Sequence, residues 1–348
     1  MKILILTQAV DTQDSSLGFF HRWIEEFSKK IKHITVICLK KGKYNLPKNV
    51  DVLSLGKEAG VSRFMYIARF YAHIWKERKN YDAVFVHMNQ EYVLLGWMVW
   101  KLLGKKIVMW RNHKMGTPLT DVAVWVSDAV CCTSQFSYTA KFKKTTVMPV
   151  GVDESIFKRD FSIQRDSRAI LSLGRLSPVK KVDVLIEALL LLDQKGMDFK
   201  AFIYGDVLER DVSYHAALQL RAEILLKKNK LQFHKGIPNR EVPRVLNSHA
   251  IFINLTPAGS FDKTILEAMA CEATVIFSND FLEGQMFRKL LVEQENVEAL
   301  ALKLEDVLKN PADFEKTQKD GRKYVIENHS LSLLADKLVG IFEGLGVR

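Results

Sequence analysis

Residues 169–193 read AILSLGRLSPVKKVDVLIEALLLLD, an apolar run followed by a basic turn and a longer apolar segment. The run at 169–174 has the length of a buried strand, and the segment 182–193 has a broad apolar face at helical spacing. Gly196 stands just beyond this segment, where glycine commonly closes a helix in the left-handed conformation. A strand that leads through a short turn into a helix is the repeating unit of a parallel α/β sheet.

The same alternation of short β-rich runs and helical segments continues in both directions along the chain. The strands that we expect lie at residues 2–7, 33–39, 50–55, 83–87, 106–110, 129–133, 169–174, 200–204, 231–235, 251–254 and 274–277. The expected helices lie at 18–32 (with Ser16 as its N-cap), 64–79, 92–103, 182–193, 212–228, 239–247, 264–271, 297–308 and 330–344. We therefore predict the α/β class, with two doubly wound, Rossmann-like domains facing a central cleft. Ligands of such sheets bind at the carboxyl ends of the strands.

Length and composition exclude several classes of protein. A chain of 348 residues is long enough for two domains, and 48% apolar with 26% charged residues is ordinary for a globular protein. The first apolar run is too short for a secretory signal, and the longest one, at 92–100, is too short to span a bilayer. The four cysteines lack zinc-ligand spacing and indicate a reducing, cytoplasmic compartment: Cys38, Cys131, Cys132 and Cys271.

The net charge of +11 is concentrated in the first half of the chain. Residues 1–150 contain 23 basic and 11 acidic side chains, a balance of +12, whereas residues 151–348 contain 28 and 29, a balance of −1. This asymmetry favours a polyanionic partner for the first half, such as an anionic lipid surface or a phosphorylated acceptor. The alternative is a basic surface that only aids solubility. Because no nucleic-acid-binding motif accompanies the basic clusters, we expect no nucleic-acid partner.

One aromatic segment lies beside several of these basic residues. The helix expected at 92–103 contains Trp97 and Trp100, and Lys101, Lys105 and Lys106 follow closely. Aromatic and basic residues together are typical of segments at the surface of an anionic membrane. The same helix would equally suit a position packed against the sheet, so both interpretations stay open.

Several common catalytic and cofactor motifs are absent from the sequence. No G-x-G-x-x-G follows the first strand, and no G-x-x-x-x-G-K-[ST] occurs, which disfavours dinucleotide dehydrogenases and P-loop NTPases. Neither H-E-x-x-H nor G-x-S-x-G is present. No Asp-x-Asp pair is evident, so we expect no metal and predict that side chains neutralise any bound phosphate.

Two segments of the second half carry residues suited to an anionic ligand. Arg175 and Lys180 share the turn after the strand at 169–174, where they would hold a diphosphate through charge-assisted hydrogen bonds. At 256–264 a loop of small residues runs into a helix, whose N-terminus suits an anion or sugar hydroxyls. Glu267 lies one turn further on among apolar neighbours, and a buried carboxylate needs a specific partner. The alternatives are a solvated basic turn and a glutamate held in a salt bridge.

Several motifs, taken together, resemble the retaining GT-B glycosyltransferases of family 4, which use nucleotide sugars. They are Gly-Arg-Leu-Ser-Pro-Val-Lys at 174–180, Tyr-Gly-Asp at 204–206 and Leu-Glu-Ala-Met-Ala-Cys at 266–271. The stretch 149–157 is similar to the family's linker into its donor domain. The resemblance covers about residues 149–348 and is weak before them.

The resemblance implies roles for individual residues. Arg175 and Lys180 match the family's diphosphate-binding pair, and Glu267 matches the acid that binds ribose hydroxyls. His113 resembles the active-site histidine near the donor sugar, and Gly18 resembles the glycine of the first loop, although a structural histidine and a turn glycine are the alternatives. The implied catalytic residues are thus His113, Arg175 and Lys180. The other implied donor-binding residues are Gly205, Ile237, Gly259, Ser260, Phe261, Asp262, Lys263 and Thr264.

The sequence departs from the family at residues 259–262. They read Gly-Ser-Phe-Asp where the family has Glu-Gly-Phe-Gly, so Gly259 replaces the first glutamate of the E-x7-E motif. Contacts from that carboxylate to the donor sugar are therefore absent.

The implied protein has three parts: an acceptor-binding domain at 1–150, a donor-binding domain at 151–330, and a helix at 331–348 that packs back on the first domain. Its implied activity is retaining, metal-independent transfer of a hexose from a UDP- or GDP-sugar to a hydroxyl of a lipid-linked or glycan acceptor, with no cofactor. A non-catalytic sugar-nucleotide-binding relative and a sugar-nucleotide epimerase of the same fold are the alternatives. The expected location is the cytoplasm, with peripheral attachment to the inner face of the plasma membrane left open.

Overall fold

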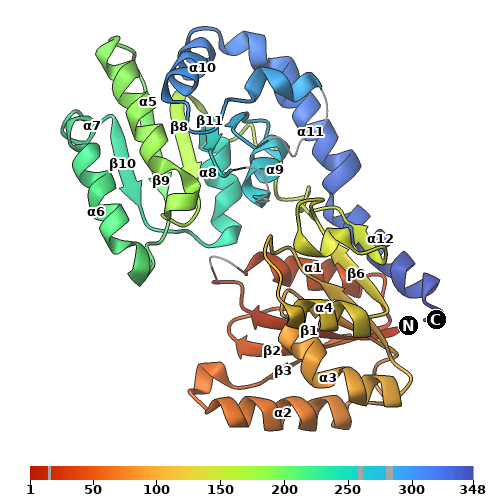
Figure 1. The fold of residues 1–348 in the computed structure, drawn as a ribbon. Coiled ribbons are helices and arrows are strands. Elements are labelled where there is room, and N and C mark those ends of the chain that lie inside the picture. The colour runs from red at the N-terminus through yellow and green to blue at the C-terminus, as the bar shows by residue number, and fades with distance from the viewer. Residues whose placement is uncertain (15–16, 258–261, 280–284, 348) are drawn as a thin grey trace. The chain divides into compact units, whose positions relative to one another are not determined.

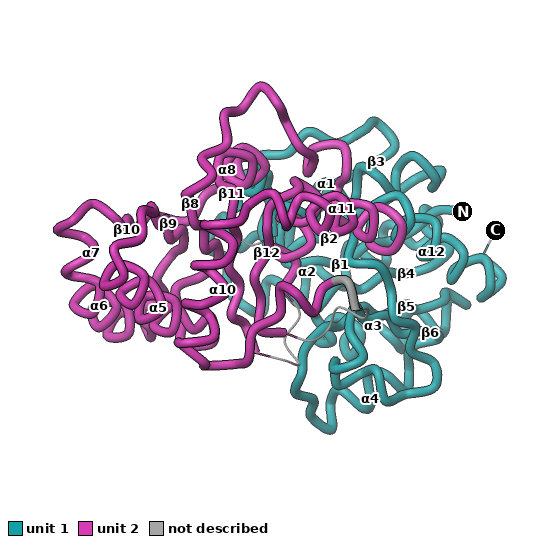
Figure 2. The backbone as a smooth tube through the Cα atoms, turned by 90° about the horizontal axis from the view of Figure 1, so that it is seen from above, with its two compact units in different colours: residues 1–151, 238–240, 330–348 teal, residues 152–237, 241–329 magenta. Residues whose placement is uncertain are grey.

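The computed structural model describes residues 1–14, 17–257, 262–279 and 285–347. The chain forms two compact units, each built around one parallel sheet. Unit 1 comprises residues 1–151, 238–240 and 330–348, and unit 2 comprises residues 152–237 and 241–329 (Figure 2). The predicted α/β class is therefore confirmed.

Unit 1 contains a seven-stranded parallel sheet. In spatial order its strands are β3 (Val50–Ser54), β2 (His33–Lys41), β1 (Lys2–Val10), β4 (Ala83–His87), β5 (Lys106–Trp110), β6 (Ala129–Cys132) and β7 (Thr145–Val147). Successive residues of β1 alternate between two apolar cores, Ile3 and Ile5 facing one and Leu4 and Leu6 the other. A strand buried on both faces explains why the sequence reads as one apolar run.

Helices cover both faces of this sheet (Figure 1). One face carries α1 (Phe19–Ser28) together with α12 (Leu331–Gly344), and the other carries α2 (Arg63–Lys76), α3 (Gln90–Leu102) and α4 (Pro118–Val126). In α1, Phe20, Trp23 and Phe27 recur at helical spacing and are buried. The indole N–H of Trp23 donates to the carbonyl of Gly151 at 3.2 Å.

Unit 2 contains a five-stranded parallel sheet. Its strands, in spatial order, are β10 (Leu231–His234), β9 (Lys200–Tyr204), β8 (Asp166–Leu173), β11 (His249–Asn254) and β12 (Thr274–Phe277). Its helices are α5 (Val182–Gln194), α6 (Val212–Arg221), α7 (Glu223–Lys227), α8 (Val242–Ser248), α9 (Lys263–Ala270), α10 (Val297–Lys309) and α11 (Glu315–His329). The strand order reverses direction between β8 and β11, and in doubly wound sheets a ligand binds at such a reversal.

Most predicted elements are present within a few residues of their expected bounds, and the differences are few. The helix predicted at 212–228 is two helices, α6 and α7, separated at Ala222. The sequence analysis did not predict α4, α11 or β7. The proposed N-cap Ser16 lies outside the described residues, and the N-cap of α1 is Gly18. In the described part of the chain, no helix is long and apolar enough to cross a membrane.

The aromatic helix at 92–103 is packed against the sheet. Trp100 is fully buried and contacts Phe70 of α2 edge to face, with their ring centroids 6.0 Å apart. Tyr92 also stacks on Phe70, at 5.9 Å. Of the two interpretations that the sequence permits for this helix, the structure supports the packed one.

Candidate functional site

The loops that follow β8 and β11 meet at the reversal point of the unit 2 sheet. The loop after β8 contains a short 3₁₀ turn, Pro178–Lys180, that leads into α5. The Lys180 ammonium lies 3.3 Å from the Thr256 hydroxyl, which belongs to the loop after β11, and donates to the Asp262 carboxylate. The structure therefore brings together two regions 82 positions apart in the sequence, both of which the sequence analysis selected.

The Asp262 carboxylate accepts most of the hydrogen bonds of this cluster. Asp262 is the N-cap of α9, where its carboxylate accepts from the backbone N–H of Thr264 at 3.1 Å and from the Thr264 hydroxyl at 2.8 Å. Asn254, at the end of β11, donates to the same carboxylate from its amide at 2.7 Å. The sequence analysis selected Asp262 as part of a loop whose backbone faces a sugar, and it did not foresee this role of the side chain.

The surroundings of Asp262 keep it ionised. Burial by itself raises the pKa of this carboxyl, but the charge of Lys180 and the hydrogen bonds from Lys180, Asn254 and Thr264 outweigh burial and lower the pKa to about 2. At neutral pH the Asp262 carboxylate is therefore negatively charged where it contacts the Lys180 ammonium.

A second ion pair lies one turn along α9. The ammonium of Lys263 is 3.7 Å from the carboxylate of Glu267, at the i, i+4 spacing that places two side chains on one helix face. Burial lowers the pKa of Lys263, and the attraction of Glu267 and Asp153 opposes that change. Glu267 itself is 3% exposed, so its carboxylate is a buried acid with a basic neighbour, as one of the two interpretations of the sequence anticipated.

Arg175 differs from Lys180 in its surroundings. Its side chain is exposed, and no hydrogen bond or ion pair joins its guanidinium to a residue that the structure describes. The backbone around it is held in place, because Gly174 N–H donates to the Tyr204 carbonyl and Leu176 N–H to the Asp206 carbonyl, both at 3.0 Å. The turn is therefore fixed while its guanidinium remains available to a ligand.

Gly205 is needed for the close approach of two backbones. A Cβ atom on Gly205 would lie 2.0 Å from the carbonyl oxygen of Gly174, nearer than any side chain can stand. The glycine thus allows the ends of β8 and β9 to pack together, which gives the predicted donor-binding residue Gly205 a structural reason of its own.

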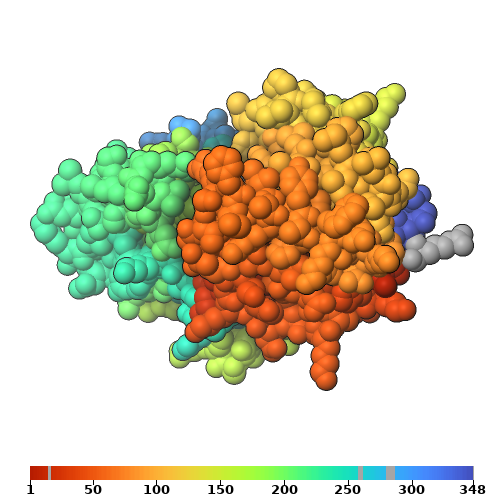
Figure 3. All heavy atoms as spheres, turned by 90° about the horizontal axis from the view of Figure 1, so that it is seen from below, coloured from red at the N-terminus to blue at the C-terminus, as the bar shows by residue number. Residues whose placement is uncertain are grey.

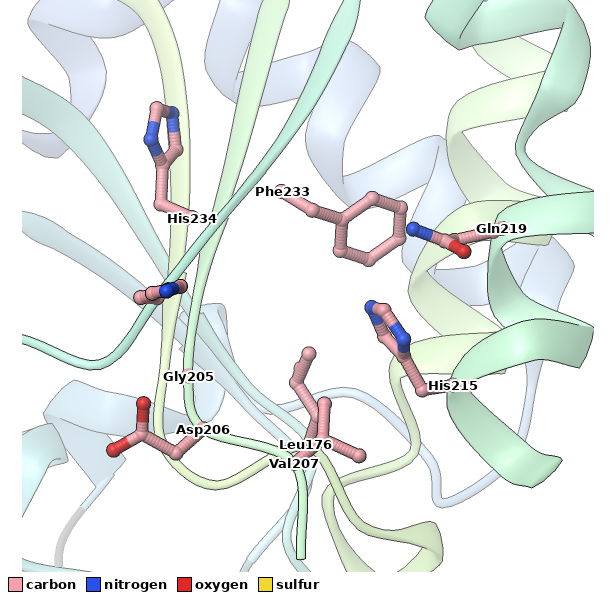
Figure 4. A pocket seen from close by; sticks show the side chains of 9 residues that line it. Leu176, Gly205, Asp206, Val207, His215, Gln219, Phe233 and His234 are labelled. Atoms are coloured by element: carbon pink, nitrogen blue, oxygen red, sulfur yellow. The ribbon is translucent and has the colours of Figure 1, made fainter. Parts of the chain in front are cut away.

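A pocket of about 610 Å³ opens beside these strand ends. Its lining residues are Leu176, Gly205, Asp206, Val207, His215, Gln219, Phe233, His234 and Lys235 (Figure 4). Phe233 faces His215 edge to face, with ring centroids 5.7 Å apart. The volume and the aromatic lining are those of small-molecule sites in general.

The predicted residues of the first domain lie in unit 1. Gly18 is the N-cap of α1, and its N–H donates to the Asp14 carbonyl at 3.0 Å. His113 is exposed, and its Nδ1 lies 3.0 Å from both the backbone N and the carbonyl O of Met115, which fixes the orientation of the ring. Arg175, Lys180 and Glu267 belong to unit 2, so the structure divides the predicted site between the two units.

The sequence analysis did not select one unusual residue at the carboxyl end of a strand of unit 1. Met88 follows β4, where the strand order of this sheet reverses, and has a φ of +68°, a strained conformation for a residue with a side chain. Such strain often marks functional loops, but no sequence signal distinguishes Met88.

The remaining predicted residues divide into two groups. Gly259, Ser260 and Phe261 lie outside the described residues. Ile237 is half-buried at the end of unit 2's first segment. Among the described residues, no three His, Cys, Asp or Glu side chains are grouped as ligands of a metal ion.

Solved structures with the same fold include a glycosyltransferase. HepE of Anabaena in complex with UDP is 17% identical, with a TM-score of 0.76, over 99% of this chain and 100% of that one. A glycosyltransferase of Rickettsia africae is 19% identical, with a TM-score of 0.73, over 99% and 98% of the two chains. Sucrose-phosphate synthase of Thermosynechococcus elongatus is 15% identical, with a TM-score of 0.74, over 99% of each chain. This chain therefore has the GT-B fold.

The sequence itself identifies the class of enzyme. Residues 153–325 match the family described as glycosyl transferases group 1. This segment makes up most of unit 2, and the match together with the GT-B fold makes the protein a glycosyltransferase. A search of curated proteins finds no match to the chain.

Proposed function

We propose that the protein transfers a hexose from a UDP- or GDP-sugar to a hydroxyl of a lipid-linked or glycan acceptor, with retention of anomeric configuration and without a metal. The observation that carries the proposal is the meeting of Lys180 with the start of α9 at the reversal point of the unit 2 sheet. HepE has been solved with UDP and with UDP-glucose, which favours a UDP-sugar as the donor here.

Each part of the donor has a matching group in unit 2. The exposed Arg175 and the ammonium of Lys180 would bind the diphosphate, and the buried carboxylate of Glu267 would accept hydrogen bonds from the ribose hydroxyls. The pocket beside Gly205 and Phe233 would receive the planar base. The family places a hexose near residues 259–264, of which the structure describes Asp262, Lys263 and Thr264.

The proposed reaction is attack of the acceptor on the same face from which the nucleotide leaves. The bond between the anomeric carbon and the phosphate oxygen breaks, the acceptor oxygen bonds to that carbon, and the departing phosphate takes the acceptor proton. Arg175 and Lys180 stabilise the charge that grows on the diphosphate, which is the role that cationic side chains fulfil in phosphate chemistry. His113 would contact the donor sugar from unit 1.

We assign acceptor binding to residues 1–150 and donor binding to residues 151–330, with α12 returning to the first domain. The balance of +12 in residues 1–150 suits an acceptor or a membrane surface with negative charge. The protein would then act in the cytoplasm, attached peripherally to the inner face of the plasma membrane.

One observation favours the alternative of a non-catalytic relative. Two of the three side chains assigned to the donor already have protein partners, Lys180 with Asp262 and Glu267 with Lys263. Asp262 also stands where the family has glycine. A donor must therefore compete with a carboxylate for the Lys180 ammonium.

A donor screen tests the proposal. The full chain is mixed with UDP- and GDP-hexoses, with and without EDTA, and nucleotide release and thermal shift are measured. We expect one donor to be hydrolysed in EDTA, and Arg175→Ala to lower turnover by about 10²–10³. Arg168→Ala is the matched control, because Arg168 is an exposed arginine at the start of β8 whose partners are Asp166 and Asp198.

The other outcomes identify the alternatives. A thermal shift by a nucleotide without hydrolysis or transfer would indicate a binding protein, and an isomerised sugar nucleotide would indicate an epimerase. Inverted anomeric configuration of the product, read by NMR, would contradict retention.

A further inference from the structure

The outward face of α2 is apolar along its whole length. Its exposed residues include Phe64, Met65, Ile67, Tyr71 and Trp75, which we call the α2 face. The side chain of Phe64 is 85% exposed and that of Trp75 is 56% exposed. Ala68 and Ala72 lie between them and are exposed as well.

The α2 face is not needed for the packing of α2 on the sheet. The opposite side of the helix provides that contact through Phe70 and Ile74, which are fully buried in the core of unit 1. A surface helix in water normally has polar residues on its outward side. An apolar stripe on both sides therefore indicates that the outward one is covered by something else.

Two other helices that pack in the same core also have exposed apolar residues. The Tyr71 hydroxyl of α2 donates to the Leu95 carbonyl of α3 at 2.9 Å, so α2 and α3 lie side by side. On α3, Leu102 is 88% exposed, and on α4, which packs in the same core, Trp125 is 75% exposed. Figure 3 looks onto the side of unit 1 that α2 occupies, drawn in orange.

The charges around the α2 face are mostly positive. Residues 63–79 contain five basic side chains, Arg63, Arg69, Lys76, Arg78 and Lys79, and one acidic side chain, Glu77. Arg63 and Lys76 stand at the two ends of the helix, and Arg78 lies over the Trp75 ring at 4.6 Å. A strip of Phe, Ile, Tyr and Trp flanked by Arg and Lys is complementary to a bilayer surface that is apolar inside and negative at its headgroups.

We propose that the α2 face binds the surface of an anionic lipid bilayer, with the helix lying in the plane of the interface. This inference names the surface for the membrane attachment proposed above, and it uses no residue of the donor site. Because α2 is already folded and anchored by Phe70 and Ile74, it binds without the cost of ordering a disordered segment. A protein partner or a second copy of the chain would also cover the apolar stripe, but neither would require the flanking positive charge.

Vesicle sedimentation with the full chain tests the proposal. The vesicles are pure phosphatidylcholine, or phosphatidylcholine with roughly 30% phosphatidylglycerol, which makes their surface negative. We expect binding to the anionic vesicles, weakened by salt, and little binding to the neutral ones. The double variant Phe64→Gln/Trp75→Gln should lower the partition coefficient by roughly tenfold or more, since two exposed aromatic anchors are removed.

The control is Phe161→Gln, because Phe161 is also 85% exposed but belongs to unit 2. It should bind vesicles as the wild type does, and circular dichroism should show that all variants are folded. Equal binding by the double variant, or no binding of the wild type to anionic vesicles, would overturn the proposal. A concentration-dependent dimer that the double variant dissociates would also overturn it, in favour of a second copy.

Discussion

Lys180 and Asp262 form an ion pair that ties the loop after β8 to the start of α9. The same carboxylate caps α9 by accepting a hydrogen bond from the Thr264 N–H. One side chain therefore both neutralises the lysine of the loop and caps the start of the helix. Any diphosphate that Lys180 binds must therefore replace Asp262 or share the ammonium with it. This pair consequently contributes to the stability of unit 2 and, under the proposed function, opposes the binding of a donor by Lys180.

Removal of Lys180 should destabilise unit 2. In Lys180→Ala the buried Asp262 carboxylate loses its cationic partner, and removing one partner of a buried pair costs roughly 3–5 kcal/mol. All six tryptophans lie in unit 1, so the unfolding of unit 2 should be followed by far-ultraviolet circular dichroism in urea. Lys181→Ala is the control, because Lys181 pairs with the exposed Glu295 and should cost less than about 1 kcal/mol. Equal effects of the two variants would contradict this account.

The pair also predicts how stability depends on pH. Asp262 has a pKa of about 2 in the folded protein against 3.8 ordinarily, so its contribution is fully present above pH 4 and is lost as the pH falls to 2. The shift corresponds to about 2 kcal/mol. The stability difference between wild type and Asp262→Asn should thus shrink by that amount from pH 5 to pH 2, measured by thermal unfolding. A difference that stays constant with pH would show that the Asp262 charge does not stabilise the fold.

Glu267 should set the preference for a ribose with free hydroxyls. The wild type is expected to bind UDP more tightly than 2′,3′-dideoxy-UDP, since hydrogen bonds to a carboxylate are stronger than those to a neutral group. Glu267→Gln should reduce this preference roughly tenfold in isothermal titration calorimetry. The ratio of the two affinities is insensitive to a general loss of stability. Glu272→Gln, which removes a partner of Arg322 just beyond α9, should leave the ratio unchanged.

Gly205→Ala should destabilise unit 2 because its Cβ would collide with the Gly174 carbonyl at 2.0 Å. Overpacking of this kind costs roughly 1–3 kcal/mol. Gly321→Ala in α11 is the matched control: its Cβ would meet Met269 at 3.5 Å, an ordinary contact, and should be neutral or slightly stabilising. The free energy of unfolding of both variants is measured by circular dichroism in urea. If Gly205→Ala is as stable as the wild type, the ends of β8 and β9 can move apart without cost.

The prediction of the fold relied on the contrast between apolar and polar positions. It missed the elements in which this contrast is absent. In α11 the buried residues are Gly321 and Val325, so the sequence shows no apolar stripe. In α4 the opposite holds, because Trp125 and Val122 on the outside are as apolar as the residues inside. The strand β7 is a short edge strand with exposed residues, which leaves no alternation to read.

The candidate site was predictable only in part. The turn with Arg175 and Lys180 and the start of α9 were each recognisable as local patterns. Their contact was not, because the order of strands β8 and β11 in the sheet, and not the sequence spacing, brings Lys180 to Asp262. An aspartate two residues before a threonine at a helix start is a common N-cap signal, and it is the one local indication of Asp262 that was overlooked.

The return of α12 to unit 1 has a consequence for how the protein is made. Leu334, Leu338 and Phe342 of α12 belong to the same apolar core as Phe20 and Trp23 of α1, although all of unit 2 is synthesised between the two helices. On the ribosome, the sheet of unit 1 and α1 would emerge long before α12, the second helix on that face. Nascent chains should therefore keep part of that face exposed to chaperones until translation has passed residue 342.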